Sequence, residues 1–241
     1  MNYYKHIILL VLVFLSLNLF SQINLMFHSE IGKNNVSNGY FIKTASILEV
    51  ALNKKNYISG GVQIDIKNDF DQKFTGSFIM YSRNFSIKKF HFGMDGFYMY
   101  NPFSKLFYET NWGIIFKTQR KHFIYKLGTS FRKYSISRKA INDNNIKGNT
   151  QISENWNIMY LLQYNLKPIR NKWNIGVSLT NIDYFIINQE TNPVIYMQAK
   201  YKFNKPLTVF LEVWHKSAGS LNISVNHFGY LIRSKLLWNI N

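Results

Sequence analysis

The stretch Ile58-Ser59-Gly60-Gly61-Val62-Gln63-Ile64-Asp65-Ile66 decides the fold of this chain. Four of the five side chains at the even-numbered positions are apolar, namely Ile58, Val62, Ile64 and Ile66. The odd-numbered positions between them contain Ser59, Gln63 and Asp65. Successive side chains of a β-strand point to opposite faces, so this alternation predicts a strand. One face of that strand would meet an apolar medium and the other a polar one.

The same alternation returns along most of the chain, for example in residues 23–31, where Ile23, Leu25, Phe27 and Ile31 alternate with Asn24, His28 and Glu30. Regular helices are not indicated after the N-terminal segment. The candidate strands lie near residues 23–32, 42–52, 57–66, 74–83, 89–100, 106–118, 121–134, 153–165, 172–182, 194–203, 207–216 and 219–240. This predicts an all-β fold, an antiparallel up-and-down transmembrane β-barrel of about 12 strands, within a range of about 10 to 14.

The connections between these segments alternate in length. Short ones are expected at 53–56, 84–88, 119–120, 166–171 and 204–206, and longer ones at 32–41, 135–152 and 183–193. Outer-membrane barrels have short turns on one side and long loops outside the cell. Residues 135–152 are the best candidate for an exposed surface segment. Tyr and Trp near many strand ends fit the aromatic girdles of such barrels.

Residues 1–22, MNYYKHIILLVLVFLSLNLFSQ, have the layout of a secretory signal peptide, with one Lys before a short apolar run. Cleavage between Ser21 and Gln22 would leave residues 22–241 as the barrel. Leu19 is larger than the residue usually found three positions before the cleavage site, so an uncleaved anchor is the alternative. No later stretch approaches the roughly 20 apolar residues that a spanning helix needs.

The composition excludes several kinds of chemistry. The absence of Cys rules out disulfides, thiolate metal sites and cysteine nucleophiles. The six His residues lack metal-ligand spacing, and His215 with Ser217 fits an exposed loop better than a catalytic pair. We expect no catalytic, cofactor or metal site and no enzymatic activity. The net charge of +17 comes from Lys spread singly through the chain, so no nucleic-acid partner is expected.

Charged side chains on the polar faces would line the inside of the barrel. The lumen-facing candidates are Asp65, Glu109, Lys117, Lys126, Arg132, Glu212 and Lys216, with Lys200 placed less securely. They either border a water-filled lumen that prefers anions or form a salt-bridged plug. Phe210, Trp214 and Met159 are also expected to point inward, which favours a closed or constricted lumen.

Residues 219–228 (GSLNISVNHF) and 176–181 (GVSLTN) resemble strands of the type IX secretion membrane proteins of the PorP/SprF kind. Nearly the whole chain after the signal resembles small outer-membrane barrels. The signal peptide, the alternating strands and the lack of a later spanning helix together predict export and insertion into the Gram-negative outer membrane, surrounded by lipid. Other envelope or secretion proteins are the candidate protein partners.

The expected role is therefore structural, secretion-accessory or assembly-related, without catalysis. One alternative is a passive diffusion pore with a mild anion preference. Another is a secreted soluble β-barrel or sandwich that binds a ligand. The soluble alternative predicts that the apolar faces, such as that of Ile58, Val62 and Ile64, point inward.

Overall fold

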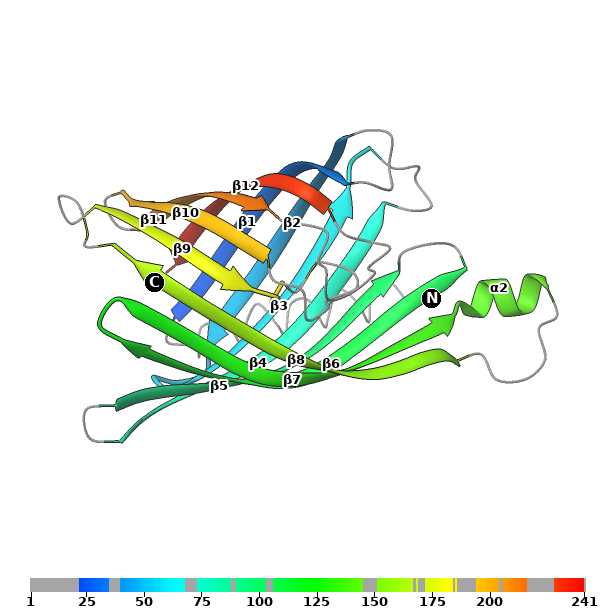
Figure 1. Ribbon diagram of the computed structural model, residues 1–241, viewed down its shortest axis with the longest axis horizontal. Coiled ribbons are helices and arrows are strands. Elements are labelled where there is room, and N and C mark those ends of the chain that lie inside the picture. The colour runs from blue at the N-terminus through cyan, green and yellow to red at the C-terminus, as the bar shows by residue number, and fades with distance from the viewer. Residues whose placement is uncertain are drawn as a thin grey trace, which may run out of the picture.

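The computed structural model describes residues 22–34, 40–67, 73–87, 90–102, 106–144, 151–166, 168, 172–183, 185, 194–203, 206–215 and 228–240. Within these ranges twelve β-strands close into one antiparallel barrel (Figure 1). The strands are β1 (Gln22–Asn34), β2 (Tyr40–Ala51), β3 (Asn56–Asp65), β4 (Phe74–Ile87), β5 (Phe90–Pro102), β6 (Phe107–Arg120), β7 (Phe123–Ile136), β8 (Gln151–Asn165), β9 (Trp173–Thr180), β10 (Val194–Lys202), β11 (Leu207–His215) and β12 (Phe228–Ile240). The expected fold class and strand number are confirmed.

The barrel is closed by the pairing of β1 with β12, in a register that places Ile23 opposite Ile240 and Glu30 opposite Arg233. All other neighbouring strands are consecutive in sequence, which is the up-and-down topology. The last expected segment, 219–240, was too long because β12 begins at Phe228. Residues 216–227 lie outside the described residues.

The start of β1 and the end of β12 lie at the same end of the barrel, which we call the terminal end. The connections expected to be short are at this end. One of them is the two-residue turn Lys121–His122, where Lys121 has a φ of 51°. Tight hairpin turns need such left-handed backbone to match the twist of the flanking strands.

The longest expected loop, at the opposite end, contains the short helix α2 (Arg138–Asp143), which extends beyond the barrel rim in Figure 1. The expectation of no helix was wrong here. The side chain of Ser137 caps α2 by accepting a hydrogen bond of 3.1 Å from the backbone N–H of Ala140. A helix of six residues is too short to give a periodic apolar pattern in the sequence.

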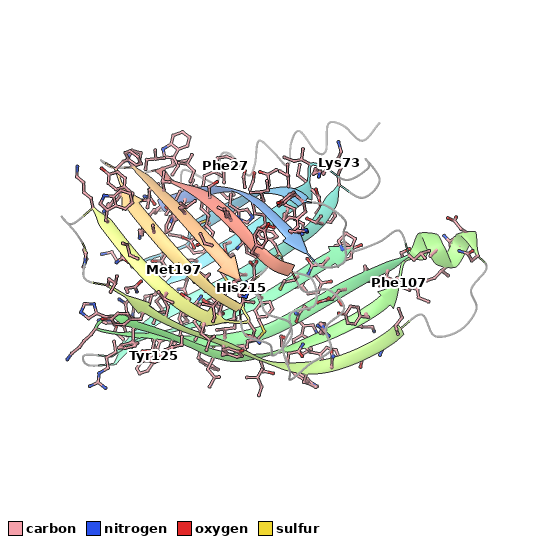
Figure 2. The ribbon with its side chains drawn as sticks, turned by 45° about the horizontal axis from the view of Figure 1, so that its top comes forward. Phe27, Lys73, Phe107, Tyr125, Met197 and His215 are labelled. Carbon is pink, nitrogen blue, oxygen red and sulfur yellow. The ribbon has the colours of Figure 1, made fainter. Side chains whose placement is uncertain are left out.

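The outer face of the wall is apolar, as the alternation predicts, and the inner face combines polar and charged side chains with a buried apolar cluster. Val62 is 51% exposed and Leu127 63%, whereas Gln63 is fully buried. Phe27, Tyr125 and Met197, labelled in Figure 2, belong to the same exposed apolar set on three other strands. This is the reverse of what a soluble barrel or sandwich predicts. No helix among the described residues is long and apolar enough to cross a membrane.

Candidate constriction inside the barrel

The wall is shortest at β9, β10 and β11, which have eight, nine and nine residues, while the neighbouring β8 has fifteen. After Thr180 the chain leaves the wall, and residues 181–183 and 185 are buried. We call these four residues the inner segment. Its entry is fixed by Asn181, whose side chain donates to the Ile158 carbonyl (2.6 Å) and accepts from the Tyr160 N–H (2.8 Å).

The apolar residues of the inner segment reach strands on the far side of the barrel. The Phe185 ring meets the His28 ring of β1 edge to face, with centroids 5.3 Å apart, and the Phe78 ring of β4 at 5.2 Å. β1 and β4 lie four and five strands away from β9 around the closed wall. Ile182 and Phe185 also join a buried cluster of Ala45, Phe78, Phe97, Met99, Ile115, Met159 and Leu161. The inner segment therefore crosses the lumen.

The charged residue of the inner segment is tied to β12. The Arg233 guanidinium lies 2.6 Å from a carboxylate oxygen of Asp183 and 2.6 Å from one of Glu30. Glu30 also accepts from the Gln63 amide at 3.2 Å, and Gln63 in turn accepts from Thr75 at 3.0 Å. Burial alone would raise the pKa of the Asp183 carboxyl, but the Arg233 guanidinium and the Phe185 N–H together hold it below its usual value.

A second ion pair is next to the first. Lys235 donates to Glu212 at 2.7 Å, and the other oxygen of Glu212 accepts from the Trp214 indole N–H at 2.8 Å. Arg233 lies 4.7 Å above the Trp214 ring, and the Tyr196 ring stacks on Trp214 with centroids 4.3 Å apart. The cation–π contact and the stacking give this side of the lumen a rigid aromatic surface.

A third charged group lies on β5, β6 and β7. Lys117 donates to Asp95 at 2.8 Å. Lys126 lies directly opposite Lys117 in the β6–β7 register. Among the described residues, none forms an ion pair with Lys126 within 4.0 Å. Two cations therefore face each other across neighbouring strands, and the carboxylate of Asp95, which pairs with Lys117 and also acts on Lys126, offsets part of their repulsion.

The structure places the predicted lumen residues as follows. Asp65, Glu109, Arg132 and Glu212 are buried, and Lys117 and Lys126 lie on the same face of their strands as the buried residues Ile115 and Ser130. Lys117, Lys126 and Glu212 belong to the charged groups just described. Asp65 lies opposite Lys43, which in turn lies opposite Glu30. Arg132 donates to Asn155 at 3.2 Å. Lys216 and Ser21 lie outside the described residues, and Gln22 is the first residue of β1.

The structure also describes the apolar residues that were expected to point inward. Trp214 and Met159 are buried, and Phe210 lies on the same face of β11 as Trp214, with the Lys200 ammonium 5.3 Å from the centre of its ring. His215 is exposed, and Ser217 lies outside the described residues. No group of three His, Cys, Asp or Glu side chains in the described part of the chain is placed to hold a metal ion.

Sequence reasoning missed the residues that tie the inner segment in place. Glu30 was assigned to the polar face of its strand but not singled out as a site residue. Arg233 and Lys235 alternate with Ile232 and Leu236, but they lay in the undivided segment 219–240. Asp183 follows the end of a strand, where no periodic pattern marks which way a side chain points.

No protein-family model matches the sequence, and no curated protein matches it. Solved structures do match. The KdgM porin has a TM-score of 0.52 at 10% identity, covering 90% of this chain and 99% of that one. The NanC porin has a TM-score of 0.53 at 8% identity, covering 90% and 98%. The COG4313 outer membrane channel from Pseudomonas putida F1 has a TM-score of 0.53 at 7% identity, covering 91% and 95%.

The chain has the fold of outer-membrane β-barrels. At these identities the likeness shows the fold alone. The expected resemblance to type IX secretion membrane proteins of the PorP/SprF kind has no support from these comparisons. The segment quoted for it, 219–228, lies mostly outside the described residues, and 176–181 forms an ordinary part of β9 and the entry to the inner segment.

Proposed function

We propose that this protein is a narrow diffusion channel of the Gram-negative outer membrane, without catalytic activity, and that the inner segment forms its narrowest point. The observation that carries the proposal is a closed wall with an apolar outer face and charged and polar side chains inside, where the inner segment crosses it. A closed barrel satisfies all of its backbone hydrogen bonds within the wall and can therefore lie in lipid. A soluble protein would leave this apolar outer face in water.

Aromatic pairs on the outer face support the membrane placement. At the terminal end the Phe123 and Tyr164 rings lie 5.0 Å apart, and the Trp173 and Tyr201 rings 4.7 Å apart. Farther along the same wall the rings of Trp112, Phe131 and Trp156 form a second group with centroids 5.0 to 5.8 Å apart. Two aromatic levels are typical of the two interfaces of a bilayer. The terminal end would face the periplasm, with α2 outside the cell.

Several polar side chains on the inner faces of β5 to β8 are buried without a hydrogen-bond partner in the described part of the chain. The side-chain amides of Asn101 and Asn111 and the Ser130 hydroxyl have no hydrogen-bond partner among the described residues. The side-chain NH2 group of Asn157 on β8 also has no hydrogen-bond partner among the described residues. Buried polar groups of this kind are normally satisfied by water. Because these atoms have almost no solvent-accessible surface, we infer that single bound waters satisfy them beside the inner segment, and that passage of water along this side requires the side chains to move.

The three charged groups described above contain equal numbers of opposite charges, four cations (Lys117, Lys126, Arg233 and Lys235) and four carboxylates (Glu30, Asp95, Asp183 and Glu212). Arg233 neutralises two of these carboxylates, so Lys126 is the cation of these groups that has no ion-pair partner among the described residues. A mild preference for anions is therefore expected to depend on Lys126 more than on Lys117.

The test is the reversal potential in planar bilayers under a KCl gradient. The parent should conduct with a mild anion preference that fades as the salt concentration rises, because exposed charges are screened over about 8 to 10 Å at physiological ionic strength. Lys126→Glu should shift the preference towards cations. A parent that prefers cations, or a Lys126→Glu variant that conducts with unchanged selectivity, would contradict the proposed charge pathway.

A structural or assembly role in the envelope is the second candidate. It is favoured by α2, which extends past the rim beside the long strands β7 and β8 (Figure 1). Purification that recovers stable stoichiometric envelope partners, combined with no conductance, would support this role over the channel.

A further inference from the structure

A cavity of about 170 Å³ lies inside the barrel beside the inner segment. Most of its lining is apolar or aromatic, including Phe78, Phe185, Tyr196, Trp214, Leu161 and Ile182. A comparable apolar cavity of about 150 Å³ holds one benzene ring. The space is therefore of the right order for a ligand with one six-membered ring or a branched aliphatic body.

Three cations border the same cavity, namely Lys126, Arg233 and Lys235. Arg233 is held by Asp183 and Glu30, and Lys235 by Glu212. No carboxylate in the described part of the chain forms an ion pair with Lys126 within 4.0 Å, and the negative charge that acts on it, Asp95, is already paired with Lys117. A negative group bound at Lys126 would also lower its repulsion with Lys117, which lies opposite, and with Lys235, which acts on it from across the cavity.

A second pocket, of about 420 Å³, lies at the terminal end and is lined by Lys117, Ile124 and residues of the β4–β5 hairpin. Because Lys117 and Lys126 are cross-strand neighbours, the two lysines connect this pocket with the central cavity. An anion that enters from the terminal end would meet Lys117 first and Lys126 next.

We propose that the central cavity is a binding site for a small monocarboxylate with a compact apolar body, whose carboxylate pairs with Lys126 while its body packs against Phe185, Tyr196 and Trp214. The proposal rests on the proposed channel function, which it deepens by naming a solute class. The aromatic wall selects the apolar body, and Lys126 selects the negative charge.

The test uses the full chain in detergent with benzoate as the probe and benzamide as its neutral counterpart, measured by titration calorimetry. Benzoate should bind at least about tenfold more tightly than benzamide, the effect of one charge-assisted hydrogen bond. Lys126→Gln should remove this difference, and Lys126→Arg should retain it. The matched control is Lys133→Gln, on the same strand but on the outward face and ion-paired with Glu154, and it should bind as the parent does.

The proposal would be overturned if the parent bound benzoate and benzamide equally or did not bind benzoate. It would also be overturned if a folded Lys126→Gln variant bound benzoate as tightly as the parent does. The benzoate and benzamide comparison needs no variant and holds even if Lys126→Gln fails to fold. Bilayer recordings separate the two proposals. If the protein conducts, benzoate does not block the current and calorimetry shows no binding, the binding site is contradicted but the channel function is not. If benzoate binds but the protein does not conduct, the channel function is contradicted but the binding site is not.

Discussion

Asp183 and Arg233 are 50 residues apart in sequence, yet the Asp183 carboxylate lies 2.6 Å from the Arg233 guanidinium inside the barrel. This contact joins the inner segment, which follows β9, to β12, three strands farther around the wall. The far end of the segment is held by the ring contacts of Phe185. Both attachments keep the segment across the lumen.

We expect Asp183→Asn to widen the channel. The amide retains the shape of the side chain but loses the charge that pairs with Arg233, so the inner segment should leave the lumen more often. Single-channel recordings should show a higher mean conductance or more frequent openings to a larger level. Asp143→Asn, in the exposed helix α2, is the control and should conduct as the parent does. Identical conductance in Asp183→Asn and the parent would show that the contact does not set the pore size.

Acid should act in the same direction as Asp183→Asn. The pKa of Asp183 is held below its ordinary value of 3.8 by Arg233 in the folded protein, with His28 as the other titratable group that favours its charged form. A carboxyl with a lowered pKa stabilises the fold above its unfolded pKa and loses that contribution as the pH falls through the folded value. Conductance should therefore be steady from pH 8 to about pH 4 and rise only below the ordinary carboxyl pKa. A rise centred near pH 6 would assign the change to another group.

Arg233→Gln should destabilise the barrel strongly. Removing one partner of a buried ion pair leaves uncompensated charge and costs about 3 to 5 kcal/mol, and here two carboxylates, Asp183 and Glu30, would lose their cation. The free energy of unfolding by urea in lipid vesicles measures the loss. The triple variant Glu30→Gln, Asp183→Asn, Arg233→Gln removes all three charges of this ion-pair cluster, so it should recover part of the lost stability. A single variant as stable as the parent would mean that water reaches these carboxylates freely.

The sequence predicted the wall well because its information is local. Val62 and Gln63 alternate every two residues, and a strand converts that alternation directly into an outer and an inner face. The constriction was not predictable in the same way. Asp183 reaches the lumen only because β9 ends at Thr180, and its partner Arg233 is defined by the register of β11, β12 and β1. Lys117 and Lys126 could be assigned to a face, but their direct opposition depends on the two-residue turn between β6 and β7.

The membrane placement can be tested on the outward face. Leu127 is the most exposed apolar side chain of β7, so Leu127→Arg would place a charge in the lipid. Near the bilayer centre such a change costs about 2 to 4 kcal/mol, and near the interface much less. Folding into vesicles should be impaired by a comparable amount, while Gln119→Arg, exposed at the terminal end, should fold normally. Equal folding of both variants would argue against lipid around this face.

Two glycines of the long strands offer a final test of the wall itself. A Cβ added to Gly128 would run into the backbone of β6, at the carbonyl oxygen of Ile114 and the Cα of Ile115. Backbone of a paired strand cannot move aside without loss of hydrogen bonds, so Gly128→Ala should lower the free energy of unfolding by about 1 to 3 kcal/mol, the usual cost of overpacking. At Gly96 on β5 the same Cβ would meet nothing within 4 Å, and Gly96→Ala should leave stability unchanged or slightly raised. Urea unfolding of the two variants side by side measures the difference. Equal stability would show that β6 and β7 are farther apart at this position than the register of Ile115 opposite Gly128 implies.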